Sequence, residues 1–470
     1  MKNIILLLTD TYRYDNLFDR ATRPVRTPEL DRFAGERATE VHGMHTGSFP
    51  TIPQRTDLAQ GRLGWPHFPW QDIRQSGGNT LVETLKNAGY ATQLLCDCPH
   101  LFNAGFQHGF HAAYQTRGQE GDTYFLHLND PIRREQPLEK TRPTRLLGQE
   151  YSVGDVHRWT NRYYACEEDT FPAKTSRLVV RWLEENCAAR PFFLWVDFFD
   201  PHEPWDPPEY LVRRYDPEYT GAPMIQPNYG RADELTPEEL HNLWAHYAAE
   251  AELVDRMLGR VLQKIDDLQL WHDSVVVVTS DHGTSLGEHA RIGKSNINPR
   301  DDRRWPIYPE VCRVPFLLAG GGVPQGGSLD LQAQPMDILP TLCELAGVAV
   351  ESPLPLQGRS FAGAVREGRG THRDLTVSAS YYGPRETLPE RAVTPFAVSQ
   401  RWGYTPAGPD GRPELYDLIV DPLAAVNIID DHPESAREMH DRFLAYLSQH
   451  EVDESLIRMW ERHASAAVGS

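Results

Sequence analysis

The first three quarters of the chain contain short apolar runs that are typical of strands covered on both faces. Five such runs lie at residues 3–9, 90–95, 192–198, 274–280 and 314–318. Within them, apolar residues mostly follow one another instead of alternating with polar ones, as in a parallel sheet that is covered on both sides. The pattern therefore predicts a buried, mainly parallel sheet.

Between these runs, apolar residues recur at helical spacing. The longest such stretch extends from Leu240 to Ile265 and predicts one long amphipathic helix. Shorter helices are expected at residues 27–33, 79–89, 173–185 and 336–346. Thr27 and Asn79 are the expected N-caps of the first two. Strands that alternate with helices predict an α/β fold, a mainly parallel sheet flanked by helices and joined by right-handed crossovers.

The segment at residues 353–372 is rich in Pro, Gly and Arg, which predicts a linker to a second, smaller unit. Beyond it we expect short antiparallel strands and one closing helix, at residues 375–380, 397–400, 414–417 and 434–447. The predicted organisation is a catalytic α/β domain over residues 1–360 and a C-terminal α+β subdomain over residues 361–470.

Residues 114–165 form an insertion in the first domain. The segment is polar, irregular and rich in aromatic residues, and it shows no convincing core element. Long insertions of this kind often serve as lids or binding loops. A disordered surface segment is the alternative, which the aromatic residues disfavour.

The chain has a formal net charge of −19, so binding through a nucleic-acid backbone is not expected. A substrate anion would need a local cationic site. The apolar run near the N-terminus is too short for a signal sequence or a membrane span. The six cysteines show no framework spacing and predict buried free thiols. We expect a cytoplasmic protein without membrane association, and a homo-oligomer remains open.

Acidic residues and histidines gather where the predicted strands end. They are Asp10, then Asp197, Asp200 and His202, and finally Asp281 with His282. In open α/β sheets, sites form beyond the carboxyl ends of the strands. A single strand-end Asp is often only a helix cap. Several such clusters together favour a metal-dependent hydrolase site.

A candidate nucleophile lies in the stretch from Thr51 to Arg62. Pro50 and Pro53 suit the entry of a helix, which places the Thr51 hydroxyl near a helix N-terminus, where an anion is favoured. Arg55 follows one turn later and can reach the same anion. A surface helix with one exposed Arg is the alternative.

Thr51, Pro53, Arg55, Gly61 and Arg62 resemble, in register, the signature of the sulfatase branch of the alkaline phosphatase superfamily. That family carries a Cys or Ser, oxidised to formylglycine, where this chain has a Thr. A Thr is not a substrate for that maturation, but it is similar to the nucleophile of phosphodiesterases elsewhere in the superfamily. The resemblance extends into the C-terminal subdomain through residues 414–427.

The resemblance implies a divalent metal ion held by Asp10, Thr51, Asp281 and His282. Thr11 stands where relatives usually have a second acid, and His282 stands where calcium-dependent sulfatases tend to have Asn. Imidazole suits manganese, zinc or iron better than calcium, which prefers oxygen ligands. In this respect the chain resembles phosphonate monoester hydrolases and phosphodiesterases. A capping or core histidine is the alternative for His282.

The resemblance also assigns catalytic roles to Thr51, Arg55, His202 and Lys294. His202 would lie near the substrate anion and the leaving group, and Lys294 would neutralise a transferring oxygen. The alternatives are a turn histidine packed on Trp205 and an ordinary solvated lysine. Asp97 occupies a position where sulfatases have a Lys, and the next histidine, His100, comes one place late.

These features predict a metal-dependent hydrolase of phosphate diesters or phosphonate monoesters that acts on a small anionic ester through Thr51. His202 or His289 would protonate the leaving alcohol. A sulfatase without formylglycine and a two-metal phosphodiesterase that recruits Asp197 or Asp200 are alternatives. A non-catalytic binding protein with the same fold is another.

Overall fold

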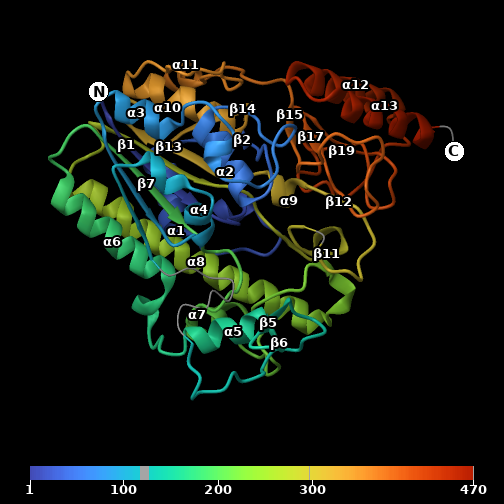
Figure 1. The fold of residues 1–470 in the computed structure, drawn as a ribbon, viewed down its shortest axis with the longest axis horizontal. Coiled ribbons are helices and arrows are strands. Elements are labelled where there is room, and N and C mark those ends of the chain that lie inside the picture. Colours follow the sequence, from blue (N-terminus) through green and yellow to red (C-terminus); the bar gives the residue numbers. More distant parts are fainter. Residues whose placement is uncertain (117–125, 296, 469–470) are drawn as a thin grey trace.

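The computed structural model describes residues 1–116, 126–295 and 297–468, so part of the predicted insertion lies outside the described residues. Its centre is an eight-stranded sheet in the order β14-β2-β13-β9-β1-β7-β3-β4 (Figure 1). The strands in that order are Gly327–Ala333, Ala38–Met44, Phe316–Gly320, Ser274–Ser280, Asn3–Thr9, Phe192–Phe198, Ala91–Cys96 and Ala112–Gln115. The prediction of a mainly parallel α/β sheet is confirmed.

The middle of the sheet is parallel and in a register that brings strand ends together. Leu6 of β1 pairs with Trp195 of β7 on one side and with Val277 of β9 on the other. β13 runs antiparallel to both of its neighbours. Strands β2 and β14 were not predicted, because polar residues such as Glu40 occupy buried positions in them.

Helices cover both faces of the sheet, as the double-sided apolar runs predict. In β1, Ile5 and Leu7 face a core that includes residues of α1 (Pro28–Glu36), α6 (Phe171–Asn186) and α8 (Pro237–Asp267). Ile4, Leu6 and Leu8 face the opposite core, with α2 (Thr51–Gln60), α3 (Leu81–Asn87), α10 (Ile338–Ala346) and α11 (Ala362–Glu367). Figure 1 shows these two helical layers on opposite sides of the sheet.

Of the two predicted N-caps, Thr27 is the N-cap residue of α1 but its side chain does not cap the helix, and Asn79 is wrong. The hydroxyl of Thr27 donates to the carbonyl of Asn16, and the first N–H groups of α1 donate instead to Asp255 of α8. Helix α3 is capped by Thr80, which forms a capping box with Glu83. The free N–H groups at the start of α1 are thus satisfied by a residue that is distant in the sequence, and those at the start of α3 by the residue after the predicted cap.

The predicted insertion has regular structure after all. It contributes the end of β4, which pairs with β3 at the edge of the main sheet, a hairpin of β5 (Pro143–Leu146) and β6 (Gln149–Ser152), and helix α5 (Val153–Thr160). The hairpin and α5 lie beside α7 (Glu209–Tyr215) (Figure 1). All of these elements are short, so their apolar pattern is too brief to detect in the sequence.

The C-terminal part forms an antiparallel sheet of β15 (Thr376–Ser378), β17 (Phe396–Val398), β18 (Trp402–Thr405) and β19 (Glu414–Asp417). Helices α12 (Pro433–Gln449) and α13 (Glu454–Val468) follow this sheet in the chain. Strand β18 and helix α13 were not predicted. The core of this part also contains Leu63 and Trp65, which follow α2. The boundary at residue 360 stays a prediction, and Phe361 packs in the core of the main sheet.

All six cysteines are free, and four of them are buried. Cys166 is exposed, which the sequence did not predict. Within the described ranges, no helix has both the length and the apolar character that a membrane span requires.

Candidate active site

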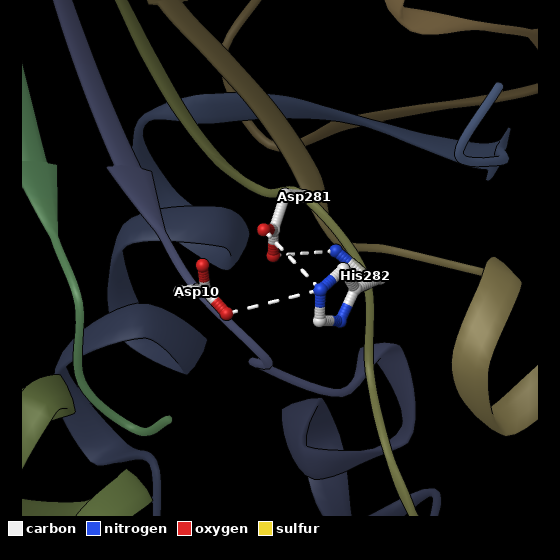
Figure 2. Close-up of side chains that lie close together, drawn as sticks. All are labelled: Asp10, Asp281 and His282. Carbon is white, nitrogen blue, oxygen red and sulfur yellow. Dashed lines mark hydrogen bonds and ion pairs between the residues drawn. The ribbon is translucent and has the colours of Figure 1, made fainter. Parts of the chain in front are cut away.

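Three candidate metal ligands meet at the carboxyl ends of two neighbouring parallel strands. Asp10 follows β1, and Asp281 and His282 follow β9. Figure 2 shows the three side chains facing one another, and each offers a ligand atom within 4.8 Å of the others. All three are fully buried. We call this group the candidate metal site.

The imidazole of His282 has a fixed orientation. Its Nδ1 lies 3.0 Å from the carbonyl oxygen of Gly283, which can only accept, so Nδ1 carries the proton. Its Nε2 faces the carboxylates, 3.4 Å from Oδ2 of Asp281 and 3.9 Å from Oδ1 of Asp10. Neither this Nε2 nor Oδ2 of Asp10 has a hydrogen-bond partner in the described part of the chain. A buried lone pair beside two carboxylates fits a bound cation.

The two carboxyl groups of the candidate metal site have pKa values that are shifted in opposite directions. Burial raises the pKa of Asp10, but Lys294 and His202 lower it more, so it lies well below the ordinary value. Burial and the Asp10 carboxylate raise the pKa of Asp281 well above its usual range. Burial and Lys294 lower the pKa of His282. A divalent cation would favour both carboxylates in ionised form beside a neutral imidazole, so this donor set fits one.

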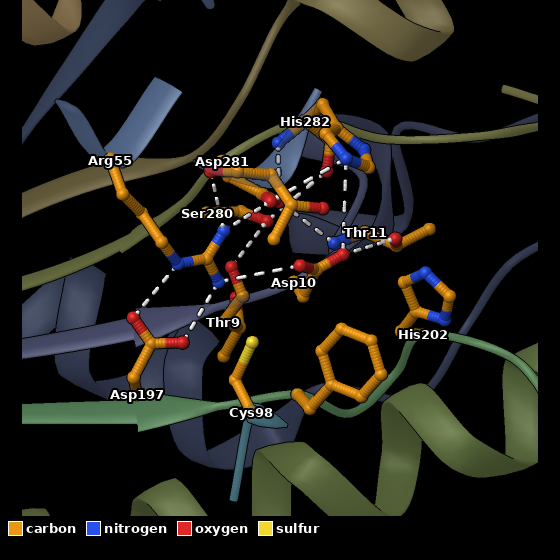
Figure 3. A network of polar contacts seen from close by, with 12 residues as sticks. Thr9, Asp10, Thr11, Arg55, Cys98, Asp197, His202, Ser280, Asp281 and His282 are labelled. Atoms are coloured by element: carbon orange, nitrogen blue, oxygen red, sulfur yellow. Dashed lines mark hydrogen bonds and ion pairs between the residues drawn. The ribbon is translucent and has the colours of Figure 1, made fainter. Parts of the chain in front are cut away.

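Arg55 ties the carboxylates together. Its Nη1 donates to Oδ2 of Asp281 at 2.6 Å, and its Nη2 lies 3.3 Å from Oδ2 of Asp10 (Figure 3). Its Nε and Nη2 hold both oxygens of Asp197, at 2.9 and 2.8 Å. The guanidinium is fully buried, so the alternative of an exposed surface Arg is wrong. Each of its three nitrogens thus binds a carboxylate, which makes the guanidinium a support for these acids.

The same contacts bear on the two-metal alternative. Both oxygens of Asp197 are bound by Arg55, and Nε1 of Trp195 also donates to one of them. The group of described residues that lies close enough to hold an ion includes neither Asp197, Asp200 nor His202. The described geometry therefore offers no second metal site built on Asp197.

Thr51 is the first residue of α2, as predicted, and it is buried. Its carbonyl oxygen accepts a hydrogen bond from Nη1 of Arg55 at 3.2 Å, and the same nitrogen binds Asp281. The helix ends at Gly61, which has a left-handed conformation with φ of 64°. One arginine thus connects the start of α2 to the candidate metal site.

Thr11 contributes to the site in a way that the sequence did not predict. Its backbone N–H donates to Asp281, and its hydroxyl donates to Oδ1 of Asp10 at 2.8 Å. Its φ of 66° is unusual for a β-branched residue and costs about 1–3 kcal/mol. The hydroxyl of Tyr247 donates to its carbonyl oxygen at 3.1 Å and helps to hold this conformation.

Lys294 contacts both Thr11 and Asp10. Its Nζ donates to the hydroxyl of Thr11 at 3.1 Å and lies 3.7 Å from Oδ1 of Asp10. Only 7% of its side chain is exposed, so the alternative of an ordinary solvated lysine is wrong. Its ammonium group thus lies beside the candidate metal site.

His202 lies in the turn after β7. Its ring stacks on Phe199 at a centroid distance of 4.2 Å, and its Nδ1 lies 2.7 Å from the carbonyl oxygen of Glu203. The alternative of a ring packed on Trp205 is not observed, since Trp205 packs on Tyr247 and donates to the carbonyl of Pro201. Figure 3 shows His202 beside Asp10 and Thr11, consistent with its effect on the pKa of Asp10.

Glu203 is a site residue that the sequence analysis missed. It is fully buried, and neither of its carboxylate oxygens has a hydrogen-bond partner in the described ranges. Its Oε2 lies 4.0 Å from Nζ of Lys294. The only available signal was its place beside His202 in the run from Asp200 to Trp205.

The remaining candidates lie further out. His289 stacks on Tyr308 at 3.6 Å, and its Nε2 contacts the carbonyl of Leu423 at 3.2 Å. His289 thus contacts groups outside the candidate metal site. Asp97 accepts from the backbone N–H of Phe199 at 2.5 Å and from the hydroxyl of Thr175 at 2.7 Å. Burial raises the pKa of Asp97 to about 7, and its bonds hold the residue on which His202 stacks.

The model of the family described as Sulfatase matches residues 2–348 of the chain. The chain belongs to the sulfatase family. The predicted family is therefore confirmed, and with it an enzyme that hydrolyses ester bonds. Members of this family use a divalent metal ion, and the candidate metal site fits that requirement.

Relatives of this sulfatase-family chain are distant but span most of its length. It is 24% identical over 462 residues to an arylsulfatase of Clostridium perfringens, covering 91% of this chain and 90% of that protein. It is 25% identical over 455 residues to a choline-sulfatase of Rhizobium meliloti, covering 91% and 82%. The structure of a phosphonate monoester hydrolase of Agrobacterium radiobacter matches with a TM-score of 0.70 at 20% identity, covering 96% of each chain. At that identity the likeness establishes a shared fold.

Proposed function

We propose that this chain hydrolyses phosphate diesters or phosphonate monoesters, with Thr51 as the nucleophile. The observation that carries the proposal is the residue at the start of α2. A buried threonine stands there, and its backbone carbonyl accepts a hydrogen bond from Nη1 of Arg55, which also binds Asp281. Because a Thr cannot be matured to formylglycine, the attacking group would be an ordinary alcohol.

Asp10, Asp281 and His282 would hold the metal ion, with the Thr51 hydroxyl as a further ligand. We propose manganese, zinc or iron rather than calcium, because the donor set includes the imidazole Nε2 of His282. When bound, such an ion acts as a Lewis acid that lowers the pKa of a coordinated hydroxyl and polarises a phosphoryl oxygen.

The chain's own groups then perform a double displacement. Thr51 would react as its alkoxide, its hydroxyl proton having passed to solvent. The oxygen of Thr51 forms a bond to phosphorus as the bond to the leaving alcohol breaks, and protonated His202 gives that alcohol its proton. Water next attacks the phospho-Thr, the neutral His202 takes a proton from the water, and Thr51 leaves as the alkoxide. Because Nδ1 of His202 faces the carbonyl of Glu203, the proton exchange would use Nε2.

The fixed charges favour a substrate with one negative charge. Lys294 is the cation that faces the transferring group, while the guanidinium of Arg55 is used by protein carboxylates. The buried acid of Glu203 lies 4.0 Å from that lysine and offsets part of its charge. A dianionic monoester would find little compensation here, whereas a small diester or phosphonate monoester would find enough.

Sulfate ester hydrolysis is the second candidate, and the relatives named arylsulfatase and choline-sulfatase favour it. A sulfate monoester also carries one negative charge, so charge alone does not separate the two. The difference lies in the second step. A sulfated Thr has no hemiacetal route for release, so a second attack at sulfur would be required, and turnover should be slow.

Parallel kinetics on matched aryl phosphodiester, aryl phosphonate and aryl sulfate esters, each with several divalent metals, test the proposal. We expect a higher kcat/KM for the phosphorus esters. A higher value for the sulfate, with Thr51 unmodified by mass spectrometry, would return the chain to sulfate chemistry. Metal binding without turnover of any ester would favour a non-catalytic role.

A further inference from the structure

A second pocket lies behind the turn that carries His202. It has a volume of about 440 Å³, within the range of small-molecule sites. Its walls come from α5, from the segment leading into α6, from the turn after β7 and from α8. We call it the α5–α8 pocket. Figure 1 shows α5 and α7 beside α8 at the end of the molecule opposite α10 and α11.

Two buried acids line this pocket, and one of them has no partner. Asp200 is 1% exposed, and neither of its carboxylate oxygens has a hydrogen-bond partner in the part of the chain that the structure describes. Glu250 is 4% exposed and accepts from the backbone N–H of Asp206. A buried carboxyl without a partner is costly whether it is ionised or neutral, so Asp200 favours a ligand that donates to it.

The cations that line the pocket are already used by other acids. Nη2 of Arg158 donates to Oδ1 of Asp206 at 2.9 Å, and its Nη1 lies 3.3 Å from Glu135. Nε of Arg162 lies 2.7 Å from Asp130. These arginines therefore leave Asp200 and Glu250 available, and either acid becomes a charged partner for a cation once it loses its proton.

We propose that the α5–α8 pocket binds a small organic cation with one or two ammonium groups, held by Asp200 and Glu250. An ammonium supplies the donors that Asp200 lacks. The rings of Tyr164 and Phe171, 5.5 Å apart, line the same pocket and can attract a cation through their faces. Lys174 already places its ammonium 3.9 Å from the centre of the Tyr164 ring, which shows that this wall tolerates such a group.

A metal ion fits the pocket less well than an organic cation. The described group of His, Cys, Asp and Glu side chains that converges within 4.8 Å is the candidate metal site, which shares no residue with this pocket. The volume is also far larger than a single ion needs. The bound state is linked to protonation, because burial and the nearby acids Glu250, Asp97 and Asp10 raise the pKa of Asp200 well above its ordinary value. A bound ammonium would offset that effect and release a proton.

The pocket shares a wall with the catalytic side of the molecule. Asp200 and Pro204 line it, and His202 and Glu203 lie between them in the chain. A cation in the pocket therefore contacts both ends of the turn that positions His202. Binding is nevertheless independent of the proposed hydrolysis, so it can be measured without any ester substrate.

Isothermal titration calorimetry on the full chain tests the proposal with 1,4-diaminobutane, butylamine and 1-butanol. We expect saturable binding in the order diamine, amine, alcohol, with proton release visible as a dependence of the heat on buffer ionisation. Asp200→Asn should weaken diamine binding by about 10- to 100-fold, the cost of one hydrogen-bonded charge contact. Glu250→Gln, on α8 and away from the turn, should weaken it to a similar extent.

Glu209→Gln is the matched control. Glu209 also lines the pocket, but its side chain is 75% exposed and paired with Arg213, so this change should leave diamine affinity unaltered. Equal affinity for diamine and butanol would overturn the proposal. Unchanged diamine binding in both Asp200→Asn and Glu250→Gln, or the absence of saturable binding by the unaltered chain, would do the same and indicate a pocket filled by water.

Discussion

Arg55 binds Asp197 through two parallel hydrogen bonds, from Nε to Oδ2 at 2.9 Å and from Nη2 to Oδ1 at 2.8 Å, and both side chains are fully buried. This fork fixes the plane of the guanidinium. The remaining nitrogen, Nη1, is thereby directed at the carbonyl of Thr51 and at Asp281. Asp197 thus orients the group that connects the nucleophile to the candidate metal site.

Removing Asp197 should destabilise the protein strongly. Asp197→Ala leaves a buried guanidinium without its main partner, and we expect the free energy of unfolding to fall by about 3–5 kcal/mol in urea titrations. Glu185→Ala is the control, since it breaks the exposed pair of Arg181 and Glu185 and should cost no more than about 1 kcal/mol. Equal losses of unfolding free energy in the two variants would show that the buried hydrogen bonds between Arg55 and Asp197 stabilise the protein no more than an exposed ion pair does.

The metal prediction concerns His282. His282→Ala removes the only nitrogen donor of the candidate metal site, so affinity for manganese, zinc or iron should fall by more than about tenfold. Elemental analysis after dialysis measures it. His289→Ala should keep its metal, because His289 stacks on Tyr308 and contacts the carbonyl of Leu423. Calcium alone, found with full activity, would refute the choice of metals.

The parts of the site that could be predicted are those that follow from strand ends. Strands β1 and β9 are recognisable as apolar runs, and neighbouring parallel strands end at one edge, so Asp10 and Asp281 had to meet there. In contrast, β2 and β14 pair across more than half of the chain and contain buried polar residues such as Glu40. No local pattern reveals such a pairing.

Other features of the site depend on contacts that only the folded chain supplies. The left-handed φ of Thr11 is fixed by hydrogen bonds to Asp281 and from Tyr247, residues far away in the sequence. Glu203 becomes notable only because Lys294 lies beside it. The resemblance indicated where Arg55 lies, but not that its nitrogens are directed at protein groups.

Asp57 should make stability depend on pH. It is fully buried, and burial raises its pKa to about 7 despite hydrogen bonds from Ser48 and from the N–H of Gly64. An unfolded Asp titrates at about 3.9. Between about pH 4 and pH 7 the folded state therefore holds more protons, so stability falls as pH rises through this window, by up to about 4 kcal/mol.

The variant Asp57→Asn cannot ionise, so its free energy of unfolding should change less between about pH 5 and pH 7 than that of the unaltered chain. Urea titrations at several pH values give the difference in slope. Asp19→Asn, at an exposed position, should follow the unaltered chain. Parallel pH profiles for Asp57→Asn and the unaltered chain would mean that Asp57 is ionised throughout.

Thr51 carries the most direct prediction. Thr51→Ala removes the group that forms the covalent intermediate, so kcat for an aryl phosphodiester should fall by roughly 10⁴- to 10⁶-fold, as for other nucleophile deletions. Thr51→Ser should keep much of the activity, because a primary hydroxyl can make the same attack. Thr56→Ala on the same helix is the control, since the Thr56 hydroxyl donates to the carbonyl of Ile52 and has no assigned role. Thr56→Ala should lose only a little activity.

If Thr51→Ala kept its activity while Arg55 and the metal content stayed intact, water rather than Thr51 would be the attacking group. In that case rapid quenching of the unaltered enzyme would yield no phospho-Thr in mass spectra.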